Sequence, residues 1–170
     1  MKHLYFMRHG LSVMNQKGLY SGKIDTPLAL EGIKQCREAA RAVKNLGIDA
    51  IVSSPMERTL ESAKIIAQEI GFPIDKIVVS DLFMERGFGP LEGTTYMSRF
   101  DLDDTKGVEH SSDIIKRAQK GLELLKSIDA DSILVVSHGA LGRALRIAID
   151  PGIDFHKTDR FNNAEVVKLI

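Results

Sequence analysis

Residues 6–15 read FMRHGLSVMN, and the change of character at Arg8 guides the interpretation of the whole chain. The apolar run HLYFM at 3–7 predicts a strand that is covered on both faces. That strand ends in two basic side chains, Arg8 and His9, followed by Gly10. A positive charge and an imidazole therefore stand at the end of the first predicted strand, and the other strand ends indicate what they bind.

Short apolar runs alternate with amphipathic segments along the chain. The segments that predict strands are 3–7, 50–54, 76–80, 132–137 and 165–170, and apolar residues at helical spacing predict helices over 31–46, 56–70, 111–127 and 140–149. This alternation predicts an α/β fold, with a mostly parallel central sheet of about five strands and helices on both faces.

A chain of 170 residues is long enough to bury a substantial core, and we predict a single domain over 1–170. Residues 87–110 are rich in Gly, Asp, Thr and Ser and show little periodicity, which predicts an irregular insertion in that domain. Long irregular loops often carry function.

Composition argues against several classes of protein. The 23 basic and 23 acidic residues leave no net charge, whereas a nucleic-acid binder needs a surplus of Lys and Arg. No apolar run approaches the ~20 residues of a membrane span, and the first residues do not form a signal peptide. The single cysteine, Cys36, excludes an intramolecular disulfide and fits a reducing compartment. We expect a cytoplasmic protein, with Cys36 on the buried face of a helix.

Basic side chains follow three of the predicted strands. Arg8 and His9 follow the first strand, Arg58 lies a few residues after the second, and His138 follows the fourth. Ligands of an open α/β sheet bind beyond the carboxyl ends of its strands, so these side chains are expected to meet. Helix N-termini add N–H donors there, and the planar fork of arginine suits phosphoryl oxygens. The sequence therefore predicts a site for a dianion such as a phosphoryl group.

Five motifs extend this pattern along the chain. They are FMRHGLSVMN (6–15), YSGKIDTPLALEGIKQ (20–35), SSPMERTLESA (53–63), FMERGFGPLEG (83–93) and VVSHGALGRAL (135–145). In this order they resemble the motifs of the histidine phosphatase superfamily, which has the phosphoglycerate-mutase-like fold. The resemblance covers nearly the whole chain.

The resemblance implies a catalytic role for each matching residue. His9 is the implied nucleophile, which becomes a phosphohistidine, and Glu85 is the implied proton donor to the leaving oxygen. Neither a metal nor a cofactor is implied. Arginines near His9 disfavour protonation of its imidazole, which agrees with a nucleophilic role. The residues implied to surround the phosphate are Arg8, Asn15, Ser21, Gly22, Arg58 and His138.

The general acid is the least secure of these assignments. The residues around Glu85 could equally form an ordinary ion-paired loop, and Glu92 is a competing acid. We prefer Glu85 because its spacing to the Glu-Gly pair at 92–93 matches the family pattern, and we expect Glu92 to hold the loop. The other histidines, expected to be structural or solvent-facing, are His3, His110 and His156.

Two departures from the family pattern concern the scaffold. Ala29 stands where the family usually has Thr or Ser, so the helix that follows is expected to lack a side-chain cap. Tryptophan is absent, although many members carry one near the Glu-Gly pair.

The superfamily contains phosphatases, which pass the phosphoryl group to water, and mutases, which return it to another hydroxyl. The segment from Glu85 to His138 is short beside that of the mutases, which predicts an open site that admits water. We therefore expect a metal-independent phosphomonoester hydrolase acting on a small phosphorylated substrate. The alternatives are a phosphoglycerate mutase-type phosphotransferase and a phosphohistidine-protein phosphatase or phospho-ligand-binding regulator.

The segment TTYMSRFDLDDTKGVEH at 94–110 is the predicted specificity loop. Its acidic residues outnumber its basic ones, with Asp101, Asp103, Asp104 and Glu109 against Arg99 and Lys106. This balance disfavours a second phosphate on the substrate. The sequence does not indicate an oligomeric state.

Overall fold

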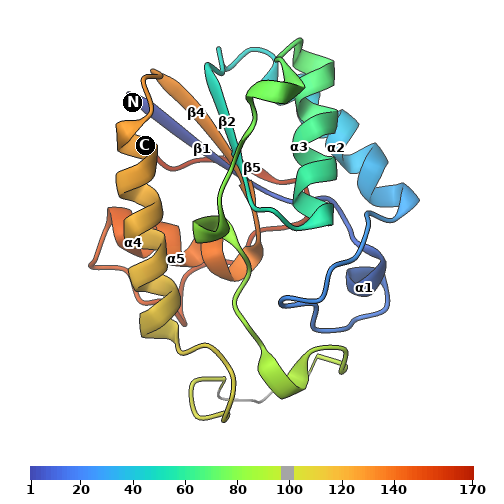
Figure 1. Ribbon diagram of the computed structural model, residues 1–170, viewed down its shortest axis with the longest axis vertical. Coiled ribbons are helices and arrows are strands. Elements are labelled where there is room, and N and C mark those ends of the chain that lie inside the picture. Colours follow the sequence, from blue (N-terminus) through green and yellow to red (C-terminus); the bar gives the residue numbers. More distant parts are fainter. Residues whose placement is uncertain (97–101) are drawn as a thin grey trace.

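The computed structural model describes residues 1–96 and 102–170. In these residues a five-stranded sheet with the order β3-β2-β4-β1-β5 forms the centre of the molecule (Figure 1). The strands are β1 (His3–Arg8), β2 (Ala50–Ser53), β3 (Val78–Val79), β4 (Ser132–Ser137) and β5 (Val166–Lys168). β1, β2, β3 and β4 are parallel, and β5 pairs with β1 in the antiparallel direction. The predicted fold class is confirmed.

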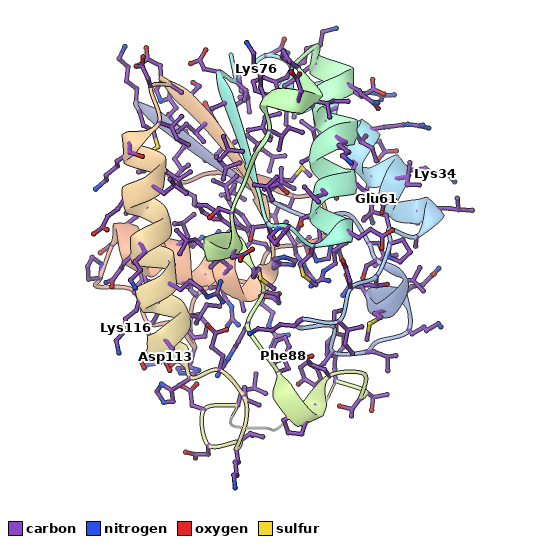
Figure 2. All side chains as sticks on the ribbon, viewed as in Figure 1. Lys34, Glu61, Lys76, Phe88, Asp113 and Lys116 are labelled. Atoms are coloured by element: carbon purple, nitrogen blue, oxygen red, sulfur yellow. The ribbon has the colours of Figure 1, made fainter. Side chains whose placement is uncertain are left out.

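Helices cover both faces of this sheet (Figure 1). The α-helices are α1 (Val13–Gln16), α2 (Leu30–Val43), α3 (Glu57–Ile70), α4 (Ser111–Ser127) and α5 (Gly139–Ile149). Short 3₁₀ helices span Ile74–Lys76, Asp81–Phe83 and Gly89–Leu91. α2 and α3 lie on one side of the sheet, and α4 and α5 lie on the other. Lys34 on α2 and Lys116 on α4 are exposed and point away from the sheet (Figure 2).

Alternate residues of the central strands pack into two cores. Phe6 and Val135 belong to the core beneath α4 and α5, whereas Met7 and Val136 belong to the core beneath α2 and α3. Because both faces are covered, the four middle residues of β1 and all six residues of β4 are buried. The continuous apolar runs in the sequence follow from this double coverage.

The third predicted strand is confirmed but is shorter than predicted. Only Val78 and Val79 of 76–80 form β3, and Lys76 ends a 3₁₀ helix. β3 is an edge strand whose two side chains are 37% and 48% exposed. The apolar run there resembled a core strand, but Pro73 begins the 3₁₀ turn and leaves room for only two paired residues.

The loop after β1 is pressed against α2. A Cβ on Gly32 would lie 2.1 Å from the carbonyl oxygen of Leu11, so only glycine permits this approach. The Leu11 N–H donates to Gln35 Oε1 and its carbonyl accepts from the Ala29 N–H. As expected, Ala29 makes no side-chain cap. Cys36 is fully buried on this helix, as predicted.

The irregular segment 87–110 contains little regular structure in its described part. Gly89–Leu91 forms a 3₁₀ turn, and Thr95 forms an isolated bridge with Leu19. Arg99 and Asp101 of the predicted specificity loop lie outside the described residues. Within the described parts of the chain, no helix has the length and apolar character needed to cross a membrane.

Candidate active site

A cavity of about 940 Å³ lies beyond the carboxyl ends of β1, β2 and β4. The Arg-His pair that ends β1 and the first residues of α5 line it. Of the eight residues predicted from the sequence, all but His138 line this cavity, namely Arg8, His9, Asn15, Ser21, Gly22, Arg58 and Glu85. The three strand ends therefore meet in one place.

His9 is a neutral, buried imidazole with a defined tautomer. Its side chain is 2% exposed, and Nδ1 lies 2.7 Å from the carbonyl oxygen of Gly10. Because a carbonyl oxygen only accepts hydrogen bonds, Nδ1 carries the proton and Nε2 keeps its lone pair. Burial lowers the pKa of His9 well below its usual range, and the charges of Arg58 and Arg8 lower it further. The ring therefore keeps an unprotonated nitrogen at neutral pH, and its role as the nucleophile stays a prediction.

His138 lies against His9 but beneath the wall of the cavity. The two ring centroids are 5.2 Å apart, and the His138 side chain is fully buried. Its Nε2 is 2.9 Å from Ser54 Oγ, and its Nδ1 has no hydrogen-bond partner among the described residues. Burial lowers its pKa well below the usual range, as do the nearby Arg58 and His9. Direct contact between His138 and a phosphoryl group stays a prediction.

The two arginines beside His9 are held by carbonyl oxygens rather than by carboxylates. Arg8 NH1 donates to the Phe161 carbonyl, and Arg58 donates to the carbonyls of Gly22 and Ile24. Arg58 is 1% exposed, and burial lowers its pKa. The Nε atoms of both arginines are buried without a partner in the described structure. A bound anion would supply the missing acceptors and neutralise the charge.

The mouth of this anion site is formed by the segment around Ser21. Its hydroxyl is buried without a hydrogen-bond partner in the described residues, which suits a phosphate ligand. The Asn15 amide Nδ2 donates to Tyr96 Oη, and Oδ1 accepts a long hydrogen bond from Asn163. The adjacent Gly22 carbonyl is occupied by Arg58. Ser21 is thus the better supported of the mouth residues.

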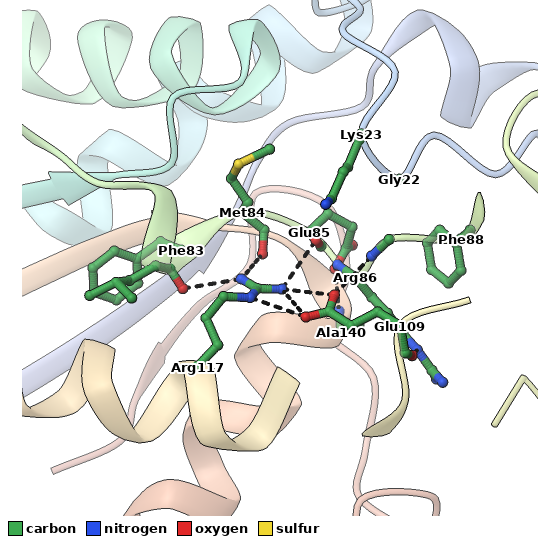
Figure 3. A network of polar contacts seen from close by, with 12 residues as sticks. Gly22, Lys23, Phe83, Met84, Glu85, Arg86, Phe88, Glu109, Arg117 and Ala140 are labelled. Atoms are coloured by element: carbon green, nitrogen blue, oxygen red, sulfur yellow. Dashed lines mark hydrogen bonds and ion pairs between the residues drawn. The ribbon is translucent and has the colours of Figure 1, made fainter. Parts of the chain in front are cut away.

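Glu85 lies across the cavity, at the N-terminus of α5. Its Oε1 accepts hydrogen bonds from the backbone N–H groups of Arg86 and Ala140, at 2.9 and 3.2 Å. The Arg117 guanidinium holds the backbone on either side by donating to the carbonyls of Met84 and Glu85 (Figure 3). The half-buried carboxylate is therefore held in one position on the wall of the cavity, and its role as the general acid stays a prediction.

Glu92, the competing acid, does not line the cavity. Its Oε1 accepts from the backbone N–H groups of Lys23 and Phe88, each at 3.0 Å. A Cβ on Gly22 would overlap this carboxylate, so Glu92 packs against the mouth segment from outside. The expectation that Glu92 holds the loop agrees with these contacts.

The remaining histidines have separate positions. His3 lies in β1, and His110 accepts the Ser112 N–H at the start of α4. His156 is more than half exposed but borders the cavity, which the sequence analysis did not predict.

Several other cavity residues were not predicted. The aromatic rings of Tyr20, Phe88 and Tyr96 pack together on the wall of the cavity. The centroid of the Tyr20 ring lies 4.9 Å from that of Phe88 and 4.9 Å from that of Tyr96. Three further arginines also line the cavity. Arg143 is four residues beyond Gly139, so the helical period alone would have placed it on the same face of α5 as the cavity-lining Gly139. The arginines that sequence reasoning missed are Arg86, Arg143 and Arg160.

Two acidic residues of the predicted specificity loop, Asp103 and Glu109, do not line the cavity. Asp103 pairs with the buried Arg86, and Glu109 pairs with Arg117. Burial raises the pKa of Asp103, but hydrogen bonds from Ser111 and the charge of Arg86 lower it overall. These two acids neutralise arginines of the scaffold, and the expectation that the substrate has no second phosphate stays a prediction.

The two buried imidazoles predict that the protein loses stability as the pH falls. In the unfolded chain His9 and His138 bind a proton near pH ~6.5, but in the folded protein their pKa values are much lower. Above that pH the two histidines cost the folded protein no stability. Below it, the free energy of unfolding falls by about 1.4 kcal/mol per pH unit for each histidine, because the unfolded chain binds protons that the folded protein does not. Urea unfolding between about pH 7.5 and pH 5 measures this slope.

His138→Asn should reduce the dependence of the unfolding free energy on pH by the share of one histidine, about 1.4 kcal/mol per pH unit. His110→Asn, which removes an exposed imidazole, is the matched control and should leave the slope as in the parent. Equal slopes for all three proteins would contradict burial of a neutral His138.

Comparison with known proteins places this chain in a family. The family model described as "Histidine phosphatase superfamily (branch 1)" matches residues 4–170. The putative phosphoserine phosphatase 2 of Hydrogenobacter thermophilus is 30% identical over 159 residues, covering 85% of this chain and 77% of that protein. The phosphatase PhoE of Bacillus subtilis is 32% identical over 162 residues, covering 93% of this chain and 82% of that protein.

Solved structures share the fold at lower identity. A mycobacterial glucosyl-3-phosphoglycerate phosphatase has a TM-score of 0.86 with 23% identity, covering 99% of this chain and 92% of that one. Bacillus stearothermophilus YhfR has a TM-score of 0.86 with 21% identity, covering 99% and 90%. With the family match over 4–170 and relatives at 30% identity or more, this chain belongs to branch 1 of the histidine phosphatase superfamily.

Proposed function

We propose that this protein is a metal-independent phosphomonoester hydrolase that transfers the phosphoryl group through His9. One observation carries the proposal: a buried neutral imidazole with a free Nε2 lies beside Arg8 and Arg58, which form no ion pair with a carboxylate among the described residues. Such a nucleophile is reactive at neutral pH, and the cations beside it stabilise the charge that spreads over the phosphoryl oxygens.

In the first step, the lone pair on His9 Nε2 forms a bond to phosphorus while the bond from phosphorus to the ester oxygen breaks. Glu85 gives its proton to that oxygen, so an alcohol leaves instead of an alkoxide. N–H groups of Arg8 and Arg58 bind the phosphoryl oxygens throughout. The products of this step are the alcohol, phospho-His9 and the Glu85 carboxylate.

In the second step, water attacks phosphorus from the side that the alcohol has left. The Glu85 carboxylate takes a proton from this water, and the bond between phosphorus and Nε2 breaks. Inorganic phosphate leaves, and His9 recovers its lone pair. Glu85 is protonated again, so the cycle is balanced without a co-reactant.

The names of the relatives support hydrolysis. Two of them are named phosphatases, at 30% and 32% identity over most of their length. A second candidate has one observation in its favour, because 60 residues are 47% identical to the 2,3-bisphosphoglycerate-dependent phosphoglycerate mutase of Chlamydia pneumoniae. That match covers 35% of this chain, and we rank the mutase second.

Phosphate release from p-nitrophenyl phosphate tests the proposal. We expect turnover to continue in excess EDTA and to be independent of added divalent ions, because the arginines supply the positive charge that a metal would supply. Loss of turnover in EDTA and its recovery with one metal would contradict metal independence. Conversion of 3- to 2-phosphoglycerate faster than phosphate release, with bisphosphoglycerate as activator, would favour the mutase.

A further inference from the structure

Two arginines line the cavity outside the phosphoryl site and have no ion-pair partner among the described residues. Arg143 lies on α5, and Arg160 lies in the segment between α5 and β5. Arg86, which also lines the cavity, differs from both because Asp103 neutralises it. Among the described residues that line the cavity, Glu85 is the only carboxylate, against five arginines. The cavity therefore has more positive charge than a single phosphoryl group requires.

The Arg143 guanidinium is held in one orientation by Phe155. Its CZ atom lies 4.5 Å from the centroid of the Phe155 ring, and NH1 donates to the Phe155 carbonyl at 3.3 Å. Stacking occupies a face of the guanidinium and leaves its other N–H groups free at the edge. Burial lowers the pKa of Arg143, as do the charges of Arg160 and Arg86, whereas Glu85 raises it. An anion at this edge would offset the cost of burying the charge.

Both arginines lie close to the phosphoryl site. Arg143 is one helical turn, ~5 Å, from Gly139. A Cβ on Gly139 would lie 3.6 Å from Arg8 Nε, so this end of α5 contacts the phosphate-binding arginine. Arg160 directly precedes Phe161, whose carbonyl binds Arg8 NH1. Arg143 and Arg160 therefore line the same cavity as Arg8, on segments that contact Arg8.

We propose that Arg143 and Arg160 form a second anion subsite, and that the substrates are small phosphomonoesters with a further acidic group. This inference rests on the proposed function, because it assumes that the phosphoryl group lies beside His9. The guanidinium edge binds carboxylate and phosphate oxygens alike, so the shared chemistry is an anion with paired oxygens. The aromatic residues Tyr20, Phe88 and Tyr96 also line the cavity and contribute no charge.

Matched substrate pairs test the subsite. 3-Phosphoglycerate and glycerol 3-phosphate differ only in a carboxylate against a hydroxymethyl group, and fructose 1,6-bisphosphate and fructose 6-phosphate differ in a second phosphate. We expect the parent to have at least a tenfold higher kcat/KM for the more acidic member of one pair. The pair that shows this preference identifies the anion as carboxylate or phosphate.

Arg143→Gln and Arg160→Gln should each reduce that ratio by about tenfold or more. Arg41→Gln on the exposed face of α2 makes the same change of charge outside the cavity and should keep the parental ratio. If Arg143→Gln fails to fold because its contact with Phe155 is lost, Arg160→Gln, which changes an exposed residue, tests the subsite by itself. Parental ratios in the folded variants, with p-nitrophenyl phosphate still hydrolysed, would overturn the subsite and leave the proposed function intact.

Binding provides a separate readout that needs no turnover. His9→Ala protein should bind 3-phosphoglycerate or fructose 1,6-bisphosphate more tightly than its neutral counterpart, as measured by calorimetry. Adding Arg160→Gln should remove that difference. If the parent hydrolyses no phosphomonoester but this difference is present, the proposed function fails and the subsite stands. Equal affinities within both pairs would contradict the subsite whatever the activity.

Discussion

His9→Ala is expected to reduce phosphate release from every phosphomonoester by more than about a thousandfold. No neighbouring group replaces a nucleophile, and covalent catalysis ends when it is removed. His138 is the nearest other imidazole, but it is fully buried and its Nε2 is bonded to Ser54. Steady-state turnover and acid-quench labelling measure the effect, and the labelled phosphoenzyme should form in the parent and be absent in the variant.

The fold should survive this substitution. His9 lies at the end of β1 and makes one side-chain hydrogen bond in the described structure, to the Gly10 carbonyl. Circular dichroism and urea unfolding should therefore show a native protein, and His110→Ala is the control for loss of an imidazole outside the cavity. If His9→Ala keeps more than about a tenth of the activity, which corresponds to only ~1.4 kcal/mol of barrier, His9 is not the nucleophile.

The part of the site at the strand ends could be predicted because a covered parallel sheet leaves a clear pattern. β1 and β4 are apolar on both faces, so each apolar run stops where its strand leaves the core, and the polar residues that follow lie in or directly beneath the cavity wall. Arg8, His9 and His138 follow from this rule. Arg58 required one more step, because it lies in the first turn of α3.

The cavity residues that do not follow a strand could not be predicted in this way. Arg160 lies in a segment without periodicity, and only the folded chain brings it near Arg8. The sequence could not distinguish Glu85 from Glu92 for the same reason, because both acids lie in irregular backbone. Glu92 accepts hydrogen bonds from the N–H groups of Lys23 and Phe88, 69 and 4 residues away in the sequence, and these contacts are visible only in the folded chain.

β3 shows the opposite failure, in which a local pattern was clear and misleading. The run KIVVS has strong β propensity, but packing decides how much of such a run is a strand. Here the run is at the sheet edge, where only β2 is available for pairing, and it is preceded by a 3₁₀ turn. The burial that makes β1 and β4 predictable is absent at Val78 and Val79.

Glu85→Gln is expected to slow hydrolysis of alkyl phosphates by ~10²–10⁴-fold, the usual contribution of a positioned general acid. An alkoxide is a strongly basic leaving group and needs the proton, whereas p-nitrophenolate hardly does. Formation of phospho-His9 from p-nitrophenyl phosphate should therefore be affected much less. Glutamine keeps an oxygen that accepts the N–H groups of Arg86 and Ala140, so the loop geometry is preserved.

The second step distinguishes this role from a structural one. Without a carboxylate to take the proton from water, phospho-His9 should accumulate in Glu85→Gln, and p-nitrophenolate should appear in a burst followed by slow turnover. Glu92→Gln makes the same chemical change outside the cavity and should show neither the burst nor the selective loss on alkyl substrates. Rapid-quench measurements on the two variants, each with an alkyl and an aryl phosphate, give the comparison. If Glu85→Gln slows both substrates equally and traps no phosphoenzyme, Glu85 only holds the N-terminus of α5, and the proton must come from another group.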